Sequence, residues 1–539
     1  MILAHLLVAG FSVGLAFVPL FNLLGFEFAV TMGTVLAYAS GWRACASAAG
    51  ARAASGPATP GPAHAFPGAA LLRAGIENLS LLLLPLAVIC VNAWRVPTCN
   101  WGEGLQFYLL FPAPGVLYGT SLGFLFGLLW PTRRARLALV LWSLATYVHV
   151  LWNVVREPPI FGFNAFVGFF PGPVYDRLIP ISARLVLARG IVVMEAVLFA
   201  TLALLLWDGT RARLAALLRP WNAQRAVPGG IALLTAVTLG MLAANGNSLG
   251  LRIDRAYIQR TLGGHIETEH CHIYYDADAY TPERAAELAR EHEFHYAELR
   301  EFFGVEPPQI GSYVYGSGAQ KKRLMGAAGT SFEDALNDEF HINAARWPHP
   351  VLRHEMAHIF AAHLDRWWRI CPQIGIHEGI AVAAEWREES AQLGLTPDEA
   401  CVAMDSLGVL PDVGSIMGAL GFWTQAHTRA YTTAGSFVRF LVDMQGMERF
   451  RRLWSSRDFE ATYGRSLDDL IAAWRRQRLS KIRLTPEQLR RAERRYLRPA
   501  VFAVPCAHEI ARLQAEASRA LGAGRAFEAE SLYAERVRI

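Results

Sequence analysis

The chain has 539 residues, of which 53% are hydrophobic and 18% are charged, and its net charge is +5. Soluble globular proteins carry about 25% charged residues. The deficit lies in one half, because residues 1–247 contain 15 Arg, no Lys and seven acidic residues. This distribution excludes a purely cytosolic enzyme, a disordered chain and a fibrous repeat, and nothing in it calls for nucleic acid. We therefore expect a membrane half followed by a soluble half.

Seven apolar stretches of the first half approach the length of about 20 residues that a helix needs to cross a bilayer. They are residues 2–24, 28–46, 78–94, 105–130, 137–155, 185–207 and 228–244. An all-α polytopic membrane domain of about seven helices is therefore predicted for residues 1–247. The Ala, Gly and Pro-rich segment 48–69 is predicted to be a linker, and the apolar segment 161–176 a re-entrant loop.

The placement of arginine predicts the orientation of these helices, because cytoplasmic loops are enriched in Lys and Arg. With seven spans, the Arg-rich loops 47–77, 131–136 and 208–227 lie on one side of the membrane. The N-terminus is then cytoplasmic, and everything after residue 245 is extracytoplasmic. This topology predicts a multi-pass protein of the cell membrane, for which we expect a bacterial inner membrane.

Three polar residues fall inside the predicted spans: Glu195, His149 and Asn153. His149 and Asn153 are four residues apart and share a helix face. The favoured interpretation is that these groups form hydrogen bonds between packed helices. The alternative is that the spans move or sense a ligand and the soluble half regulates them.

The second half begins with a small predicted sheet. Residues 265–276, 310–316 and 338–343 have strand patterns, the last expected at the sheet edge, and residues 282–303 form an amphipathic helix. Almost everything that follows is helical, which predicts an α+β domain over 248–480. A helical appendage is predicted over 481–539, ending in a hairpin about Gly522 and Gly524.

The motif "RHEMAHIFAAH" (353–363) carries the strongest chemical signal. Residues four apart lie on one face of a helix, so His354 and His358 can direct their ring nitrogens to one Zn²⁺ ion. Glu355 lies beside them and can act as a general base without being a ligand.

A third ligand is predicted twenty residues after His358, where Glu378 occurs in "IGIHEGIAVAAEW". Three protein ligands with a fourth open position are typical of a catalytic zinc site. The pattern HExxHxxGxxH is excluded, because positions 361 and 364 are Ala and Leu. The nearby His363 and His377 are expected to have structural roles.

The motifs "HEMAH", "HEGIAVAAE" and "AYTTAGSFVRFL" (430–441) together resemble the gluzincin metallopeptidases with an aminopeptidase-like or thermolysin-like catalytic module. The resemblance covers about residues 265–480 and implies a zincin-type fold that binds one Zn²⁺ ion. The zinc ligands that it implies are His354, His358 and Glu378. Glu355 would then be the general base, Tyr431 the oxyanion donor, and Glu385 a carboxylate that orients a ligand. Tyr431 has the alternative interpretation of a core aromatic residue.

These patterns favour a membrane-anchored zinc metallopeptidase that hydrolyses peptide or protein substrates on the extracytoplasmic face. The alternative is a catalytically inactive gluzincin fold that serves as a binding or assembly module. A GxMEN-type strand is missing, since the corresponding region reads "NDEFHIN", and this argues against aminopeptidase activity. The sequence leaves open the substrate, the oligomeric state, and whether Cys371 and Cys401 form a disulfide or remain free thiols.

Overall fold

The computed structural model describes residues 2–54, 67–172, 176, 178–207, 223–367, 369–386, 394–497 and 506–538. They form two compact units, one of Met1–Asp254 with Cys506–Ile539 and the other of Arg255–Pro505. The predicted appendage 481–539 is therefore divided between the units. Residues 55–66 of the predicted linker 48–69 and residues 208–222 of the loop 208–227 lie outside the described residues.

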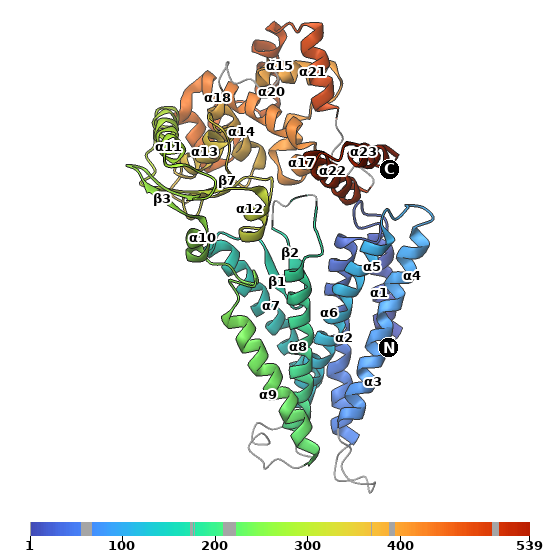
Figure 1. Cartoon of the computed structure of the whole chain (residues 1–539). Coiled ribbons are helices and arrows are strands. Elements are labelled where there is room, and N and C mark those ends of the chain that lie inside the picture. The colour runs from blue at the N-terminus through green and yellow to red at the C-terminus, as the bar shows by residue number, and fades with distance from the viewer. Residues whose placement is uncertain are drawn as a thin grey trace. The chain divides into compact units, whose positions relative to one another are not determined.

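The first unit is built from helices and one short hairpin (Figure 1). Its helices before the second unit are α1 (Ile2–Leu15), α2 (Phe26–Ala54), α3 (Gly68–Leu79), α4 (Leu83–Asn92), α5 (Trp101–Leu110), α6 (Pro112–Leu129), α7 (Thr132–Arg156), α8 (Ala183–Leu206) and α9 (Ala223–Ala244). Among the described residues, five stretches are long and apolar enough to cross a membrane, namely Gly68–Asn92, Trp101–Leu129, Thr132–Arg156, Ala183–Leu206 and Arg225–Ala244.

The predicted count of seven spans is thus not confirmed. The first predicted span contains only the 14-residue helix α1, and the second lies within α2, which is rich in small residues. Small residues on both helices allow α2 and α6 to pack closely. A Cβ atom at Gly119 would lie 2.1 Å from the carbonyl oxygen of Ala37, and one at Gly123 would lie 2.2 Å from that of Gly41. Small residues at such crossings are characteristic of membrane helix pairs.

The segment predicted as a re-entrant loop contains an antiparallel hairpin of β1 (Gly162–Asn164) and β2 (Gly168–Phe170). The Asn164 side chain stabilises its turn, because Oδ1 accepts hydrogen bonds from the backbone N–H groups of Phe166 and Val167. The hairpin is anchored to α8 by Arg189, which donates to the carbonyl oxygen of Asn164 at 3.2 Å.

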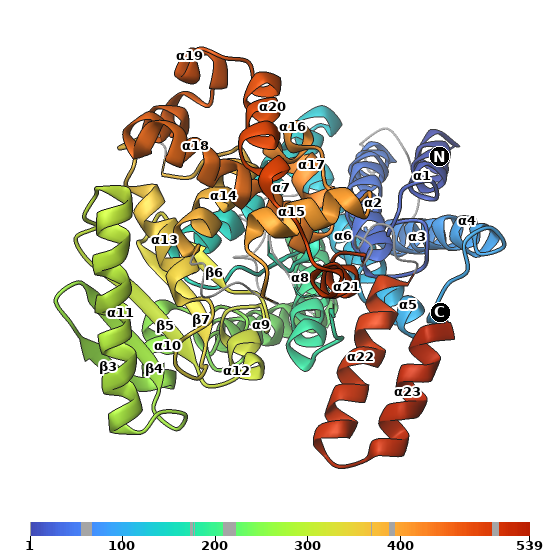
Figure 2. The same ribbon diagram turned by 90° about the horizontal axis from the view of Figure 1, so that it is seen from above.

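The C-terminal hairpin of the first unit consists of α22 (Ala507–Gly522) and α23 (Ala526–Arg538), which lie antiparallel in Figure 2. It turns at Gly522 and Gly524 as predicted, and Gly524 has a φ of 75° that favours glycine. A disulfide joins Cys506, directly before α22, to Cys99, with the Cα atoms 5.8 Å apart. Cys371 and Cys401, in contrast, are free buried thiols, so the bridge considered between them is wrong.

The second unit begins with a five-stranded mixed sheet of order β3-β4-β5-β7-β6. Its first elements are α10 (Arg255–Leu262), β3 (Gly263–Glu267), β4 (Cys271–Asp276), α11 (Pro282–Phe303), β5 (Ile310–Tyr315), α12 (Gly318–Leu324), β6 (Phe332–Asp334) and β7 (Glu339–Asn343). The stretch 265–276, predicted as one strand, is an antiparallel pair. Strand β7, predicted at the edge, is interior, because β6 pairs with its outer side and forms the edge.

Helix α11 covers one face of the sheet and has the predicted bounds. The hydroxyl of Thr281 accepts from the Arg284 N–H at its start, and Gly304 ends it with a φ of 64°. Buried His292 joins the helix to β5, with its Nε2 2.9 Å from the Ser312 hydroxyl.

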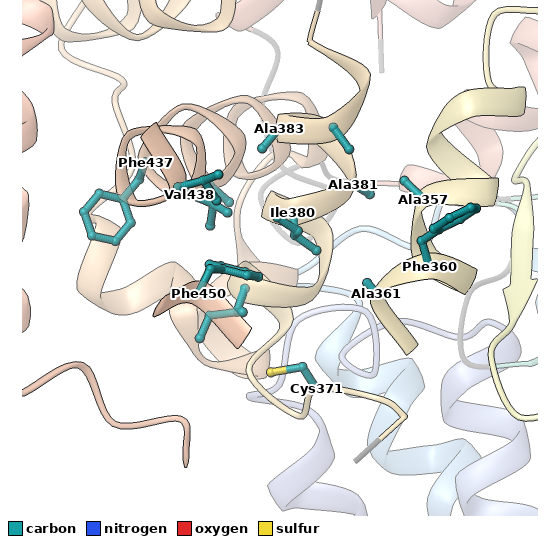
Figure 3. Close-up of a cluster of buried hydrophobic side chains, with 14 of the residues drawn as sticks. Ala357, Phe360, Ala361, Cys371, Ile380, Ala381, Ala383, Phe437, Val438 and Phe450 are labelled. Atoms are coloured by element: carbon teal, nitrogen blue, oxygen red, sulfur yellow. The ribbon is translucent and has the colours of Figure 1, made fainter. Parts of the chain in front are cut away.

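The remainder of the second unit is helical, as predicted. It contains α13 (Leu352–Ala362), α14 (Ile374–Glu385), α15 (Pro397–Ser406), α16 (Val413–Met417), α17 (Ala419–Thr424), α18 (His427–Ser456, with a break at Gly446), α19 (Phe459–Tyr463), α20 (Leu467–Gln477) and α21 (Pro486–Tyr496). Figure 3 shows the core where α13, α14 and α18 meet, with Phe360, Ile380 and Phe437 among its fully buried side chains. This packing fixes the three helices that carry the predicted site.

Candidate metal centre

Helix α13 brings the two histidines of the HExxH motif together, as the spacing predicts. The Nε2 atoms of His354 and His358 are 3.3 Å apart, and the two rings are nearly perpendicular at 81°. His358 is buried with 2% of its surface exposed, whereas His354 is partly exposed. Both rings therefore direct one nitrogen to a common point.

Helix α14 supplies the third predicted ligand. Oε2 of Glu378 lies 3.3 Å from Nε2 of His358 and 3.8 Å from Nε2 of His354. The next residue, Gly379, permits the close crossing of α14 and α18, because a Cβ atom there would lie 2.9 Å from the carbonyl oxygen of Ala434. This glycine, which follows Glu378 in the motif "HEGIAVAAE", thus has a packing role beside the candidate ligand.

The spacing of the three donor atoms fits a zinc ion. Two ligands of tetrahedral zinc, each about 2.0–2.2 Å from the metal, lie about 3.3–3.6 Å from one another. Two of the three separations fall in this range and the third, between His354 and Glu378, is slightly wider. Two imidazole nitrogens and one carboxylate also form a donor set that zinc uses in catalytic sites.

Glu385 occupies the position predicted for an orienting carboxylate. It lies seven residues after Glu378 on α14, and its Oε2 is 3.1 Å from Nδ1 of His354. A hydrogen bond at Nδ1 fixes the tautomer and the orientation of the ring, so that Nε2 faces the other two donor atoms.

Burial and mutual charge determine the protonation of this cluster in the absence of a metal ion. Burial opposes the charged form of His354, but hydrogen bonds with Glu378 and Glu385 outweigh it and hold the pKa of His354 well above its usual range. Burial likewise opposes ionisation of Glu378, yet hydrogen bonds from His354 and His358 hold its pKa well below the usual range. Two histidines therefore share a carboxylate that stays ionised.

Glu355 lies beside the ligands and is buried, with 6% of its surface exposed. Burial raises the pKa of Glu355 to about 8; the charge of His354 lowers it, whereas Glu333 and Glu378 raise it. A cation bound by the neighbouring ligands would lower this value. Glu355 is thus a carboxylate in an apolar setting whose charge depends on its neighbours.

Tyr431, at the start of α18, faces the same cluster. Its ring centroid is 6.3 Å from that of His354 and 5.1 Å from that of Phe422. Burial raises the pKa of Tyr431 above its usual range, and the charge of Glu378 and a hydrogen bond with that carboxylate act in the same direction. The residue therefore packs partly as a core aromatic, but its hydroxyl stays protonated as a donor next to the ligand set.

One residue beside the site, Glu333, was not singled out by the sequence analysis. Its Oε1 is 2.9 Å from Nε2 of His377, which was expected to be structural and whose ring centroid lies 4.6 Å from that of His358. Glu333, His358 and His377 also have potential ligand atoms within 4.8 Å of one another. Because His377 Nε2 is already engaged by Glu333, the set of His354, His358 and Glu378 is the better candidate for the ion.

The other histidine near the motif is outside the cluster, as expected. Nε2 of His363 is 2.8 Å from Oδ1 of Asp338, so this side chain joins α13 to the start of β7.

Comparison of the chain with protein-family models, with curated proteins and with solved structures finds no match. Function must therefore be argued from the site itself.

Proposed function

We propose that the chain is a membrane-anchored, zinc-dependent metallopeptidase that hydrolyses peptide bonds on the extracytoplasmic face of the membrane. The observation that carries the proposal is the convergence of the donor atoms of His354, His358 and Glu378, with separations of 3.3–3.8 Å. The proposal is further supported by the carboxylate of Glu385 and the phenol ring of Tyr431, which both lie beside His354.

A zinc ion held by these three residues would polarise the scissile carbonyl and acidify a water molecule. Glu355 accepts the proton of the attacking water and returns it to the leaving amine. The hydroxyl of Tyr431 donates to the oxygen on which negative charge develops, a contact that strengthens in the transition state. Glu385 holds His354 in the orientation that ligation needs.

The extracytoplasmic location is supported by the disulfide between Cys99 and Cys506, because such bonds persist in oxidising compartments. Four candidate spans separate Cys99 from the segment after Ala244, so the even number returns the chain to the same side. The arginines at 133, 134 and 136, in the first turns of the third candidate span, then lie at its cytoplasmic end, in agreement with the positive-inside rule. This argument does not depend on whether α1 and α2 span the membrane.

Enzymatic fusions test the orientation. Alkaline phosphatase fused after Asn245 should be active, and the same enzyme fused after Arg136 should be inactive. The reverse pattern would overturn the proposed topology.

The catalytic proposal is tested with the full chain purified in detergent, by metal analysis and by digestion of a peptide library followed by mass spectrometry. The wild-type protein should contain one zinc ion and cleave peptides. Glu355→Gln should retain the zinc and lose hydrolysis, whereas Glu378→Ala should lose both. Glu448→Gln is a matched control, because Glu448 is an exposed carboxylate of the same unit.

Three outcomes would refute the peptidase assignment. One is near-native hydrolysis by Glu355→Gln, and another is a wild-type protein that binds no zinc. A wild-type protein that binds zinc but cleaves no peptide would also refute it, and would favour an inactive binding or assembly module.

A further inference from the structure

The first unit contains a cavity of about 420 Å³ that the proposed peptide hydrolysis does not use. It lies between α6, α7 and α8 and is bordered by the β1–β2 hairpin. Helix α7 contributes one face with Trp142, Thr146 and His149, and helix α8 contributes another with Val192, Glu195 and Phe199. A cavity of several hundred Å³ with an apolar lining and few polar groups has the character of a ligand site.

Glu195 is the acidic group of this cavity. It lies at the middle of the 24-residue helix α8, about 18 Å from either end at 1.5 Å per residue. Within the described ranges, Glu195 has no hydrogen bond and no ion pair, so the predicted bonding between packed helices is not what holds it. An acidic side chain at such a depth is costly and is characteristic of functional sites.

The neighbouring Arg189 does not neutralise Glu195 by direct contact. The three nitrogens of its guanidinium group donate to the carbonyl oxygens of Leu110, Asn164 and Phe111, at 3.1–3.2 Å. Its donors therefore anchor α8 to α5 and to the hairpin. These donors are therefore not directed to an anionic ligand, whereas the carboxylate of Glu195 lines the cavity and would attract a cation.

Three aromatic rings line the same cavity as Glu195, those of Tyr118, Trp142 and Phe199. Phe199 follows it by one helical turn on the same face, and its ring centroid is 5.6 Å from that of Tyr118 and 6.1 Å from that of Trp142. Trp142 Nε1 donates to the Tyr118 hydroxyl at 2.9 Å, which fixes the group. Aromatic faces next to a carboxylate are the arrangement by which proteins bind organic cations.

A polar approach leads to the cavity from the end of α7. A second cavity of about 130 Å³ shares four lining residues with the first, including His149, and extends to Asn153 and Glu157. These three residues recur every four positions along α7, and Nε2 of His149 is 3.2 Å from Nδ2 of Asn153. Hydrogen-bonding groups therefore continue from the helix end to the aromatic cavity.

We propose that this cavity binds an organic ammonium ion with an apolar body, its charge at Glu195 and its body against Tyr118, Trp142 and Phe199. The depth of Glu195 excludes a phospholipid headgroup, which stays at the bilayer surface. The site makes the first unit a ligand-binding module as well as an anchor.

Binding of radiolabelled benzyltrimethylammonium to the full chain in lipid nanodiscs tests this proposal. The wild-type protein should bind the ion saturably, and the neutral carbon isostere neopentylbenzene should not displace it. Glu195→Gln should weaken binding about tenfold or more, and Phe199→Leu should weaken it severalfold. Glu77→Gln, which removes a carboxylate paired with Arg73 outside the cavity, should leave binding unchanged.

A charge-preserving variant separates loss of binding from loss of folding. Glu195→Asp should retain most of the binding, and benzyltrimethylammonium should raise the thermal midpoint of the wild-type protein in a concentration-dependent manner. The proposal is overturned by absence of saturable wild-type binding, by wild-type affinity in Glu195→Gln, or by equal competition from neopentylbenzene. These results are independent of peptide hydrolysis, which takes place in the second unit.

Discussion

Glu385→Gln tests the proposed role of Glu385 in orienting His354 without removing a proposed ligand. The substitution keeps the size of the side chain but removes the charge that lies 3.1 Å from Nδ1 of His354. Loss of such a partner lowers metal affinity about 10- to 100-fold. The Glu385 side chain is 32% exposed, and solvent screens its charge, so we expect the lower end of this range. A tenfold loss corresponds to about 1.4 kcal/mol.

Competition with a fluorescent zinc chelator at pH 7 measures this loss on the full chain in detergent. Glu448→Gln removes an exposed carboxylate of α18 and should keep the wild-type affinity. The zinc content at saturation should remain one ion per chain in both variants. If Glu385→Gln bound zinc as tightly as Glu448→Gln, the orienting role of Glu385 would be refuted.

Three further variants test the site and its support. Gly379→Ala places a Cβ atom 2.9 Å from the Ala434 carbonyl oxygen. It should therefore destabilise the fold by about 1–3 kcal/mol and weaken zinc binding. An unchanged thermal midpoint would contradict this expectation. Tyr431→Phe should lower kcat about 10²- to 10³-fold with little change in KM, as measured by steady-state kinetics on a cleaved peptide. Burial lowers the pKa of His292 to about 4. As the pH falls, the His292 side chain is therefore protonated in the unfolded chain before it is protonated in the folded chain. The free energy of unfolding should then fall by about 3 kcal/mol between pH 6.5 and pH 4. His292→Gln should show a smaller fall in thermal midpoint over this range, and an identical fall would exclude His292 as a cause.

Local signals in the sequence were sufficient for the long elements of the second unit. Helix α11 has the bounds expected from its amphipathic pattern, and the structure shows Thr281 capping its start and Gly304 ending it. The stretch 265–276 was predicted as one strand, since the turn between β3 and β4 contains Thr268, Glu269 and His270 and no Gly, Pro or Asn. Strand β6 has three residues, too few for an alternating pattern to be recognised.

The candidate site likewise contains residues that a local sequence pattern predicts and one that only tertiary pairing brings in. His354, Glu355 and His358 lie within about one helical turn, so their spacing in the sequence predicts that they lie together. The spacing to Glu378 is set by helices α13 and α14 and the connection 363–373 between them. Glu333 reaches the site only because β6 pairs with β7, with Glu333 opposite Phe340. Pairing of a three-residue strand with an interior strand is a tertiary event that no local pattern records.

Cysteine pairing shows most directly why sequence proximity was misleading. Cys371 and Cys401 bracket the Glu378 helix in the sequence, but both are buried separately, and burial raises the pKa of Cys371 to about 11, so its thiol stays neutral. The disulfide instead joins Cys99 to Cys506 across 407 residues. The chain from Arg255 to Pro505 is joined to the first unit by peptide bonds at both ends, and Cys506, directly after the second junction, is linked to Cys99 by the disulfide. A single proteolytic cut between Asp254 and Arg255 would therefore leave the second unit covalently linked to the first-unit helices before it until the disulfide is reduced. The intact chain thus gives the predicted metal centre two covalent connections to the helices that anchor it.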